Sequence, residues 1–384
     1  MAKVLLGDVV DHIKDKVDKD TTDLEFYVGG EHIDGDEITV RRRGRIEGST
    51  IGPAFHMRFQ QGDVLLMSRN PHLRKASMVD FDGICSDVSY VCRTKDNNVL
   101  LQSLLPFILQ TPEFWQFAEE NKKGGLPFFL NWKDFARFEF KLLPIERQQQ
   151  ISDLLWAMER VKTAYRELIA RTDDLVKSQF IEMFGDPEKN TLGLDYVQLG
   201  DIAFITKLAG FEYTKYIKYQ DSGDIIMIRG LNCKGTKLVL DDLKWIDRNT
   251  SNLLPRSKLY KGDIVITYVG TVGEIGLIDK DDTYHLAPNV AKLSLNDKSK
   301  EIPAFWAYML MISRDYLVRF ATSTTQAALN MERIRNIGFI NPPTEQQEQF
   351  VELLEQSDKS KFAAQQTLKE LTDAQRALMK KIFE

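Results

Sequence analysis

The stretches PIERQQQI, at residues 144–151, and PTEQQEQF, at residues 343–350, decide how this sequence of 384 residues is organised. When the sequence is shifted by 199 residues the first stretch lies on the second, and Pro144, Glu146 and Gln148 each meet a residue of their own type. Proline suits the first turn of a helix, where its missing N–H is not needed, and a glutamate there faces the positive end of the helix dipole. Each stretch is therefore predicted to begin a helix.

Other matches keep nearly the same offset. Leu154, Leu155 and Phe184 fall on residues of the same type at a shift of 199, and QGDVLL at residues 61–66 resembles KGDIVI at residues 261–266. Several matches near one offset predict an internal repeat, in which each of two copies is a globular part followed by a long helix. The predicted boundaries are residues 1–143 and 188–341 for the globular parts, and 144–187 and 342–384 for the helices.

Both helical runs carry mainly apolar or small residues at alternating steps of three and four. This spacing predicts that the two helices pair as a coiled coil. The alternative is that each is an amphipathic helix lying on its own globular part, but runs of about 38 residues exceed the usual length of about 8–20. The residues predicted to face the partner helix are Ile151, Leu154, Met158, Val161, Tyr165, Leu168, Thr172, Leu175 and Gln179 in the first run, and Phe350, Leu353, Ser357, Ser360, Ala364, Thr367, Leu371, Ala374 and Leu378 in the second.

The direction of the pairing follows from length. Gly185, with Pro187 beyond it, predicts where the first helix ends. That helix would be about 58 Å long at about 1.5 Å per residue, whereas a domain of about 150 residues has a radius of gyration near 15 Å. Because such a domain is too small to carry the chain back along the helix, we expect the two helices to run antiparallel.

The globular parts mix short β runs with helical patches. Runs such as VLLMS at residues 64–68 and DIVITYVG at residues 263–270 are separated by turn signals, and helical patches occupy residues 100–121 and 304–321. Strands and helices that follow no regular alternation are typical of α+β proteins. The predicted fold class is therefore α+β: two repeated α/β domains, each followed by a long helix, with the helices in an antiparallel coiled coil.

Composition excludes several classes of protein. The chain is 43% hydrophobic and 28% charged with a net charge of −5, and no stretch approaches 18 uncharged apolar residues, so we expect no membrane association and a cytoplasmic location. Three cysteines without CxxC spacing predict neither a disulfide framework nor a zinc cluster, and the scattered histidines disfavour a metal site.

No enzyme signature survives inspection. NPPT at residues 341–344 resembles the loop of amino-methyltransferases, but the aromatic residue that would stack on the base is missing. GLNCKGTK at residues 230–237 lacks the Gly-Lys-Ser/Thr order of a phosphate-binding loop. GTVGEIG at residues 270–276 is followed by a strand-like run, not a helix, which favours a β-turn over a dinucleotide site. Catalytic residues are therefore not predicted.

Two globular units, each followed by a proline, a Glu/Gln-rich opening and a long helix, resemble the specificity (S) subunit of type I restriction-modification systems. The resemblance covers essentially the whole chain. Its most specific parts are the two openings, LLPIERQQQI and NPPTEQQEQF, and the helix ends QFIEMFGDP and LMKKIFE. In the first unit SRNPHLRKA, at residues 68–76, stands in place of the glycine loop GTVGEIG of the second unit.

The resemblance implies a non-catalytic reader of double-stranded DNA. Each globular part would be a target recognition domain for one half of a bipartite, asymmetric site, and the helices would set the spacing and dock two methylation (M) subunits. Restriction (R) subunits would join through the complex. The chain itself would hold no cofactor, because S-adenosylmethionine, ATP and Mg would belong to the partner subunits.

Candidate DNA contacts are basic, amide and aromatic residues in loops and at strand ends, since such side chains reach phosphates and base edges. The densest basic group is RRRGR at residues 41–45, which is either a DNA contact or a solvated turn. In the first unit the candidates are Arg41, Arg42, Arg43, Arg45, Arg69, His72, Arg74, Lys75, Lys122 and Lys123. In the second unit they are Lys207, Tyr213, Lys215, Arg229, Asn232, Lys234, Tyr268, Thr271, Asn289 and Gln326.

Two other functions fit the same sequence. One is an interaction scaffold whose coiled coil binds protein partners and whose globular parts bind ligands other than DNA. The other is the specificity part of a fused restriction enzyme. DNA binding that is weak alone and strengthened by a methyltransferase partner would favour the specificity subunit over the scaffold.

Overall fold

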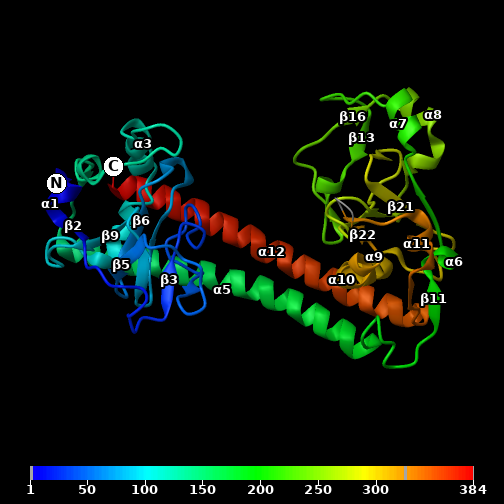
Figure 1. Cartoon of the computed structure of the whole chain (residues 1–384), viewed down its shortest axis with the longest axis horizontal. Coiled ribbons are helices and arrows are strands. Elements are labelled where there is room, and N and C mark those ends of the chain that lie inside the picture. Colours follow the sequence, from blue (N-terminus) through cyan, green and yellow to red (C-terminus); the bar gives the residue numbers. More distant parts are fainter. Residues whose placement is uncertain (1–2, 324–326, 384) are drawn as a thin grey trace. The chain divides into compact units, whose positions relative to one another are not determined.

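The computed structural model describes residues 3–323 and 327–383, which divide into two compact units. Unit 1 comprises residues 1–168 and 363–384, and unit 2 comprises residues 169–362. Each unit therefore contains one globular part together with a portion of each long helix (Figure 1). The mixed helix and sheet content predicted from the sequence is confirmed in both.

Unit 1 is built around two four-stranded sheets. The first has the order β2 (Val10–Ile13), β9 (Ser89–Thr94), β6 (Val64–Met67), β7 (Ala76–Met78), and the second has the order β4 (Gly44–Arg45), β3 (Phe26–Val28), β8 (Gly83–Ser86), β5 (Phe55–Phe59). A separate pair joins β1 (Lys3–Leu5) to β10 (Glu139–Lys141). The short helices are α1 (Leu6–Val9), α2 (Leu105–Ile108), α3 (Pro112–Glu120) and α4 (Trp132–Phe135), with 3-10 turns η1 (Pro71–Leu73) and η2 (Gln102–Leu104).

Unit 2 is also built around two four-stranded sheets. Their orders are β12 (Ala203–Lys207), β21 (Val290–Leu295), β18 (Ile264–Thr267), β19 (Ile275–Leu277), and β16 (Trp245–Ile246), β13 (Ile225–Ile228), β20 (Tyr284–Leu286), β17 (Lys258–Leu259). Two-stranded pairs join β11 (Tyr196–Gln198) to β24 (Gly338–Ile340), β14 (Cys233–Lys234) to β15 (Lys237–Leu238), and β22 (Thr322–Ser323) to β23 (Ala327–Ala328). The helices are α6 (Leu199–Ile202), α7 (Gly210–Tyr216), α8 (Arg248–Leu253), α9 (Pro303–Ile312), α10 (Arg314–Arg319) and α11 (Met331–Asn336), with 3-10 turns η3 (Gly230–Asn232) and η4 (Pro255–Ser257).

The two units share their strand order and strand sense. In the first sheet of each, all three neighbouring pairs are antiparallel. In the second sheet of each, the central pair is parallel, β3 with β8 and β13 with β20, and the two outer pairs are antiparallel.

Two helices of 40 residues, α5 (Ile145–Phe184) and α12 (Thr344–Phe383), begin at the predicted openings. The backbone of Gly185 follows α5 at φ +72°, a left-handed conformation that glycine adopts without steric cost, which explains why the helix ends there. In each unit the helix portions complete the core of the globular part. Buried residues Ile151, Leu155, Met379 and Phe383 do so in unit 1, and Val176, Phe180, Phe184, Phe350 and Leu354 do so in unit 2.

A buried glutamine fixes the start of each long helix. The side-chain oxygen of Gln148 accepts a hydrogen bond from the backbone N–H of Leu101 (3.0 Å), and its amide donates to the carbonyl of Leu143 (2.8 Å). Gln347, which lies 199 residues later, accepts from the N–H of Ile302 (3.0 Å) and donates to the carbonyl of Pro342 (2.9 Å). Identical glutamines at the predicted offset therefore make corresponding contacts.

The residues predicted to face the partner helix are partly wrong on α5. Leu154, Val161, Leu168 and Leu175 are between 45% and 55% exposed. The line that is buried instead includes polar residues whose side chains are hydrogen-bonded within the protein, so an apolar pattern along the helix does not reveal it. Its members on α5 are Gln148, Ile151, Ser152, Leu155, Glu159, Lys162, Val176, Phe180 and Phe184.

Candidate nucleic-acid interface

A cleft of about 650 Å³ in unit 2 gathers five of the predicted contact residues. It lies where β13, β18 and β21 begin or end, beside α7 and the β14 strand. Its lining combines cations, amides, hydroxyls and aromatic rings with one carboxylate. The predicted residues among them are Tyr213, Arg229, Lys234, Thr271 and Asn289, and the others are Tyr219, Gly230, Leu231, Cys233, Thr267, Val269, Glu274 and Pro288.

Local backbone geometry presents several of these groups. The backbone of Asn289 is left-handed (φ +68°), a conformation that asparagine tolerates better than most residues. The turn that follows β18 carries Gly270 and Gly273 at φ +83° and +86°, so GTVGEIG forms a turn leading into β19, as predicted. The Thr267 hydroxyl accepts a hydrogen bond from the backbone N–H of Glu274 (2.9 Å), which closes this turn.

Arg229 and Glu274 are held by ion pairs at the cleft. The Arg229 guanidinium pairs with the carboxylate of Asp242 (3.0 Å) and donates to its carbonyl (2.6 Å), while the Glu274 carboxylate pairs with Arg314 (2.9 Å). Burial raises the pKa of Tyr219 to about 12, with the adjacent Tyr213 adding to the rise. Tyr219 is therefore a neutral hydroxyl at neutral pH, able both to donate and to accept.

The remaining candidates of unit 2 are dispersed. The Lys207 ammonium lies 5.0 Å from the ring centre of Tyr268, which is itself buried, and Lys215 is exposed on α7. Asn232 is buried, and its amide donates to the carbonyl of Val239 (2.8 Å), so this side chain shapes its own loop. Gln326 lies outside the described residues.

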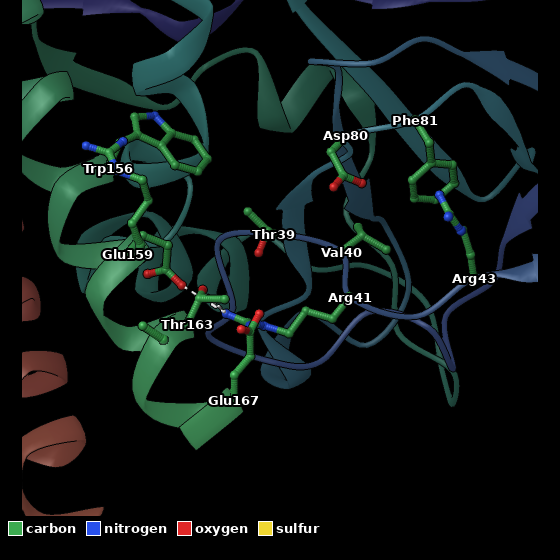
Figure 2. Close-up of a pocket in the computed structure, with 12 residues that line it drawn as sticks. Thr39, Val40, Arg41, Arg43, Asp80, Phe81, Trp156, Glu159, Thr163 and Glu167 are labelled. Carbon is green, nitrogen blue, oxygen red and sulfur yellow. Dashed lines mark hydrogen bonds and ion pairs between the residues drawn. The ribbon is translucent and has the colours of Figure 1, made fainter. Parts of the chain in front are cut away.

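The RRRGR cluster of unit 1 is tied to neighbouring groups. Arg41 pairs with Glu37 and Glu159, Arg42 with Asp34, and Arg45 with Glu25. The Arg43 guanidinium lies 4.0 Å from the ring centre of Phe26 and 4.6 Å from that of Phe81. Arg41 and Arg43 line an open cavity between this segment and α5, and Figure 2 shows Arg41 directed toward Glu159 and Thr163.

The other candidates of unit 1 lie in two neighbouring segments. The backbone of residues 68–70 pairs with that of residues 128–130, which brings Arg69 beside the hairpin that carries Lys122 and Lys123. Lys122 pairs with Glu119 (2.6 Å) and Lys123 with Asp134 (2.7 Å). Arg69 and His72 are exposed, Arg74 lies 3.6 Å from Asp36, and Lys75 donates to the carbonyl of Gly30.

Sequence reasoning missed Tyr219, Leu231 and Glu274 in the unit 2 cleft. Glu274 belongs to the quoted GTVGEIG turn, and Tyr219 lies six residues after the predicted Tyr213, so both had a signal in neighbouring candidates. Leu231 had none, because an isolated leucine in a loop resembles any core residue.

Within residues 3–323 and 327–383 no group of three or more His, Cys, Asp or Glu side chains is placed to hold a metal ion. The helices in this part of the chain include none with a run long and apolar enough to cross a bilayer. The thiols of Cys85, Cys92 and Cys233 are buried, and burial raises the pKa of each.

Comparison with known proteins gives the class of domain first. Residues 193–372, which include the whole cleft of unit 2, match the family model of the type I restriction modification DNA specificity domain.

A curated relative points the same way. Over 134 residues the chain is 28% identical to the specificity subunit of the type I restriction enzyme EcoBI from Escherichia coli. This match covers 34% of the present chain and 28% of the length of that protein.

Two solved structures share the fold along nearly the whole chain. One comes from a structural study of complex assembly and conformational transition of the type I R-M system (TM-score 0.59, 20% identity, covering 99% of this chain and 96% of that one). The other is the type I restriction-modification S subunit from M. genitalium (TM-score 0.57, 14% identity, covering 100% and 96%). The predicted resemblance to type I specificity subunits is thus confirmed.

Proposed function

We propose that this chain is a non-catalytic DNA sequence-recognition subunit of a type I restriction-modification complex. One observation carries the proposal: the segment that matches a DNA specificity domain encloses a cleft whose side chains suit contacts to DNA. Arginine, lysine, asparagine and glutamate read base edges by hydrogen bonds, and aromatic rings and hydroxyls reach bases and phosphates.

The strand arrangement supports two DNA-recognition domains in one chain. Both units combine the same two sheet orders, and corresponding glutamines anchor both long helices. We infer that the globular parts, residues 1–143 and 188–341, each read one half of a bipartite, asymmetric DNA site. Two similar readers held at a fixed separation are suited to two half-sites on one duplex.

The long helices would set the spacing as an antiparallel pair. In unit 1 the Lys162 ammonium of α5 donates to Gln375 of α12 (2.8 Å). In unit 2 Asp173 of α5 pairs with Lys361 of α12 (2.7 Å), and farther along α5 the ring of Phe180 meets Phe350 (5.2 Å between centres). Residue numbers that rise along one helix while they fall along the other support antiparallel pairing.

The helices would also dock two methylation subunits. Leu154, Val161 and Leu168 recur every seven residues, so they lie near one face of α5, and all are about half exposed. Apolar side chains repeated along one exposed helix face are suited to bind a partner protein. S-adenosylmethionine, ATP and Mg would be bound by partner subunits, and restriction subunits would join through the complex.

An exchange of readers tests this proposal. Residues 1–143 are replaced by the corresponding part of a relative, the complex is assembled with the methylation subunits, and methylated sites are mapped across a genome. We expect one half-site to change while the other half-site stays the same.

The unaltered chain and the chain exchanged at residues 188–341 are the controls. Simultaneous change of both half-sites would contradict separate reading by the two globular parts. Methylation of DNA by the purified chain without partners would contradict its non-catalytic role.

A further inference from the structure

Glu159 of α5 lies at the centre of a buried ionic network in unit 1. Its side chain is 3% exposed, and it pairs with Lys162 of the same helix (2.9 Å), whose side chain is 4% exposed. Gln375 of α12 accepts from Lys162 (2.8 Å) and donates to Glu159 (3.4 Å). The network therefore joins the two long helices.

The same carboxylate holds the globular part. Arg41, in the segment before β4, pairs with Glu159 (3.3 Å) and donates to the Thr163 hydroxyl (3.2 Å). Arg41 also pairs with Glu37 (3.3 Å), and Glu37 pairs with Arg166 of α5 (2.7 Å). Figure 2 shows Arg41 reaching from the loop to the helix beside the open cavity.

This network adjoins the apolar contact that joins the globular part to the helices, because the Gln375 amide also donates to the carbonyl of Leu155 (3.3 Å), and it extends beyond that contact along α5. The apolar contact includes Ile151 and Leu155 of α5 with Met379 and Phe383 of α12. The ionic contacts extend along α5 as far as Arg166, which is about 22 Å from Ile151 at about 1.5 Å per residue. Contacts that extend this far along α5 resist tilting of the globular part about the apolar contact.

Unit 2 has a weaker counterpart 199 residues later. Asp358 and Lys361 of α12 correspond to Glu159 and Lys162, and they pair with each other (2.9 Å). Lys237 of β15, in the globular part, pairs with Asp358 (3.1 Å), but the Lys237 side chain is 65% exposed. Lys361 also pairs with Asp173 of α5 (2.7 Å), so this position links the two helices in both units, but in unit 2 a single exposed cation, Lys237, joins it to the globular part.

We propose that Glu159 is a positioning residue, which fixes the angle of the first globular part on the helix pair and thereby narrows the DNA spacing that the protein accepts. The part of this inference that concerns spacing rests on the proposed function. The part that concerns the angle is a property of the chain alone.

The angle is measured on the full chain with spin labels at Glu47→Cys on the globular part and Lys369→Cys on α12. Both positions are exposed, and the three native cysteines are buried. Glu159→Gln removes the central charge. This change leaves Lys162 buried without a carboxylate. Glu37→Gln is therefore the second variant, because it keeps Glu159, Lys162 and Gln375 together and weakens only the contacts that Arg41 and Arg166 make with Glu37 in the globular part.

We expect a single narrow distance distribution in the parent and a broader one in both variants, with Asp358→Asn as the control that leaves this label pair unchanged. An unchanged distribution in a folded Glu37→Gln chain and in a folded Glu159→Gln chain would overturn the proposal, whatever the function of the chain.

Spacing is measured with the assembled methylation complex, on DNA in which two fixed half-sites are separated by the preferred spacer or by one base pair more or less. We expect preference for the correct spacer to fall about tenfold in Glu37→Gln, with the half-site sequences unchanged, corresponding to about 1.4 kcal/mol. If Glu37→Gln broadens the distance distribution but keeps the full preference for the correct spacer, the proposed role in spacing is overturned. If the parent complex recognises no bipartite site, both the proposed function and the role of Glu159 in spacing are wrong. The distance measurement on the chain alone still tests whether Glu159 fixes the angle of the globular part.

Discussion

In both units apolar packing joins the globular part to the long helices, but the ionic contacts that accompany this packing differ between units 1 and 2. Aromatic packing dominates in unit 2, where Phe350 meets Phe180, Phe184 and Phe305, whereas unit 1 places Ile151 at the position corresponding to Phe350. Unit 1 instead carries the buried Glu159 network. Desolvation offsets much of the attraction in a buried ion pair, so such a network adds little net stability. Its main effect is to fix the orientation of the globular part on the helices.

The largest expected difference concerns the apolar contacts. Phe350→Ala should destabilise unit 2 by roughly 3–5 kcal/mol, because a fully buried ring would leave a cavity among other rings, while Ile151→Ala in unit 1 should cost closer to 2 kcal/mol. Denaturant unfolding, with hydrogen exchange to assign the loss to a unit, measures both. A greater loss for Ile151→Ala would reverse our view of which unit depends on apolar packing.

For the ionic contacts we expect the larger loss of stability in unit 1, the opposite of the apolar contacts. Glu159→Gln leaves Lys162 buried without a carboxylate and should cost about 3 kcal/mol. Asp358→Asn should cost at most about 1 kcal/mol, because Asp358 and its partners Lys361 and Lys237 are all more exposed than the Glu159–Lys162 pair. Chemical denaturation at low and high salt provides the measurement. Equal losses for the two variants would show that burial of the network has no energetic consequence.

The buried glutamines should behave alike. Gln148→Leu and Gln347→Leu each remove the partner of a partly buried backbone N–H and of a buried carbonyl. Each should therefore cost roughly 1–3 kcal/mol, and the two losses should agree within about 0.5 kcal/mol. Unfolding free energies of the two single variants test this. A loss in only one unit would count against corresponding roles.

The smallest effect is a difference in acid sensitivity. Burial alone would raise the pKa of Glu159, but Lys162, Arg166 and Gln375 outweigh burial and hold the pKa below its ordinary value of 4.5. Burial would likewise raise the pKa of Asp358, and Lys361 and Lys237 lower it below 3.8. A carboxylate with a lowered folded pKa stabilises the fold above its unfolded value, and this stabilisation is lost as the pH falls through the folded pKa.

The stabilisation that Glu159 gives unit 1 should therefore begin to decline as the pH falls below the ordinary value of about 4.5, and the stabilisation that Asp358 gives unit 2 only below about 3.8. The charged groups that contact Glu159 are the cations Arg41, Lys162 and Arg166, and Glu37 pairs with two of these cations, Arg41 and Arg166. Hydrogen exchange followed between pH 5 and pH 3 measures the order. Loss of protection in unit 2 first would contradict it, and Glu159→Gln is the control in which the unit 1 step disappears.

Much of the fold could be predicted from local patterns. The Pro-Glu-Gln openings mark the starts of both long helices, Gly185 marks the end of one, and the β runs at residues 64–68 and 263–270 contain β6 and β18. The burial of α5 could not be predicted in the same way. Its contact line includes Glu159 and Lys162, whose burial is favourable only because Arg41 and Gln375, more than 100 residues away, satisfy them.

The candidate site was predicted by chemistry and not by geometry. Tyr213, Arg229 and Asn289 converge in the unit 2 cleft because strand ends from two sheets meet there. Asn232 had the same chemistry, but its amide serves its own loop. A sequence shows which side chains are able to contact DNA, but whether a given side chain is already bonded within the protein depends on tertiary contacts.

The division of the chain into units has a consequence for its synthesis on the ribosome. Unit 2 is one continuous segment, residues 169–362, whereas the core of unit 1 includes Met379 and Phe383 together with Leu6 and Val10. The first segment to emerge therefore has to wait for residues 363–383 before its core is complete, although domains generally fold in the order of synthesis. The apolar surface of the first globular part that α12 later covers, near Ile108 and Phe140, stays open to chaperones during this interval.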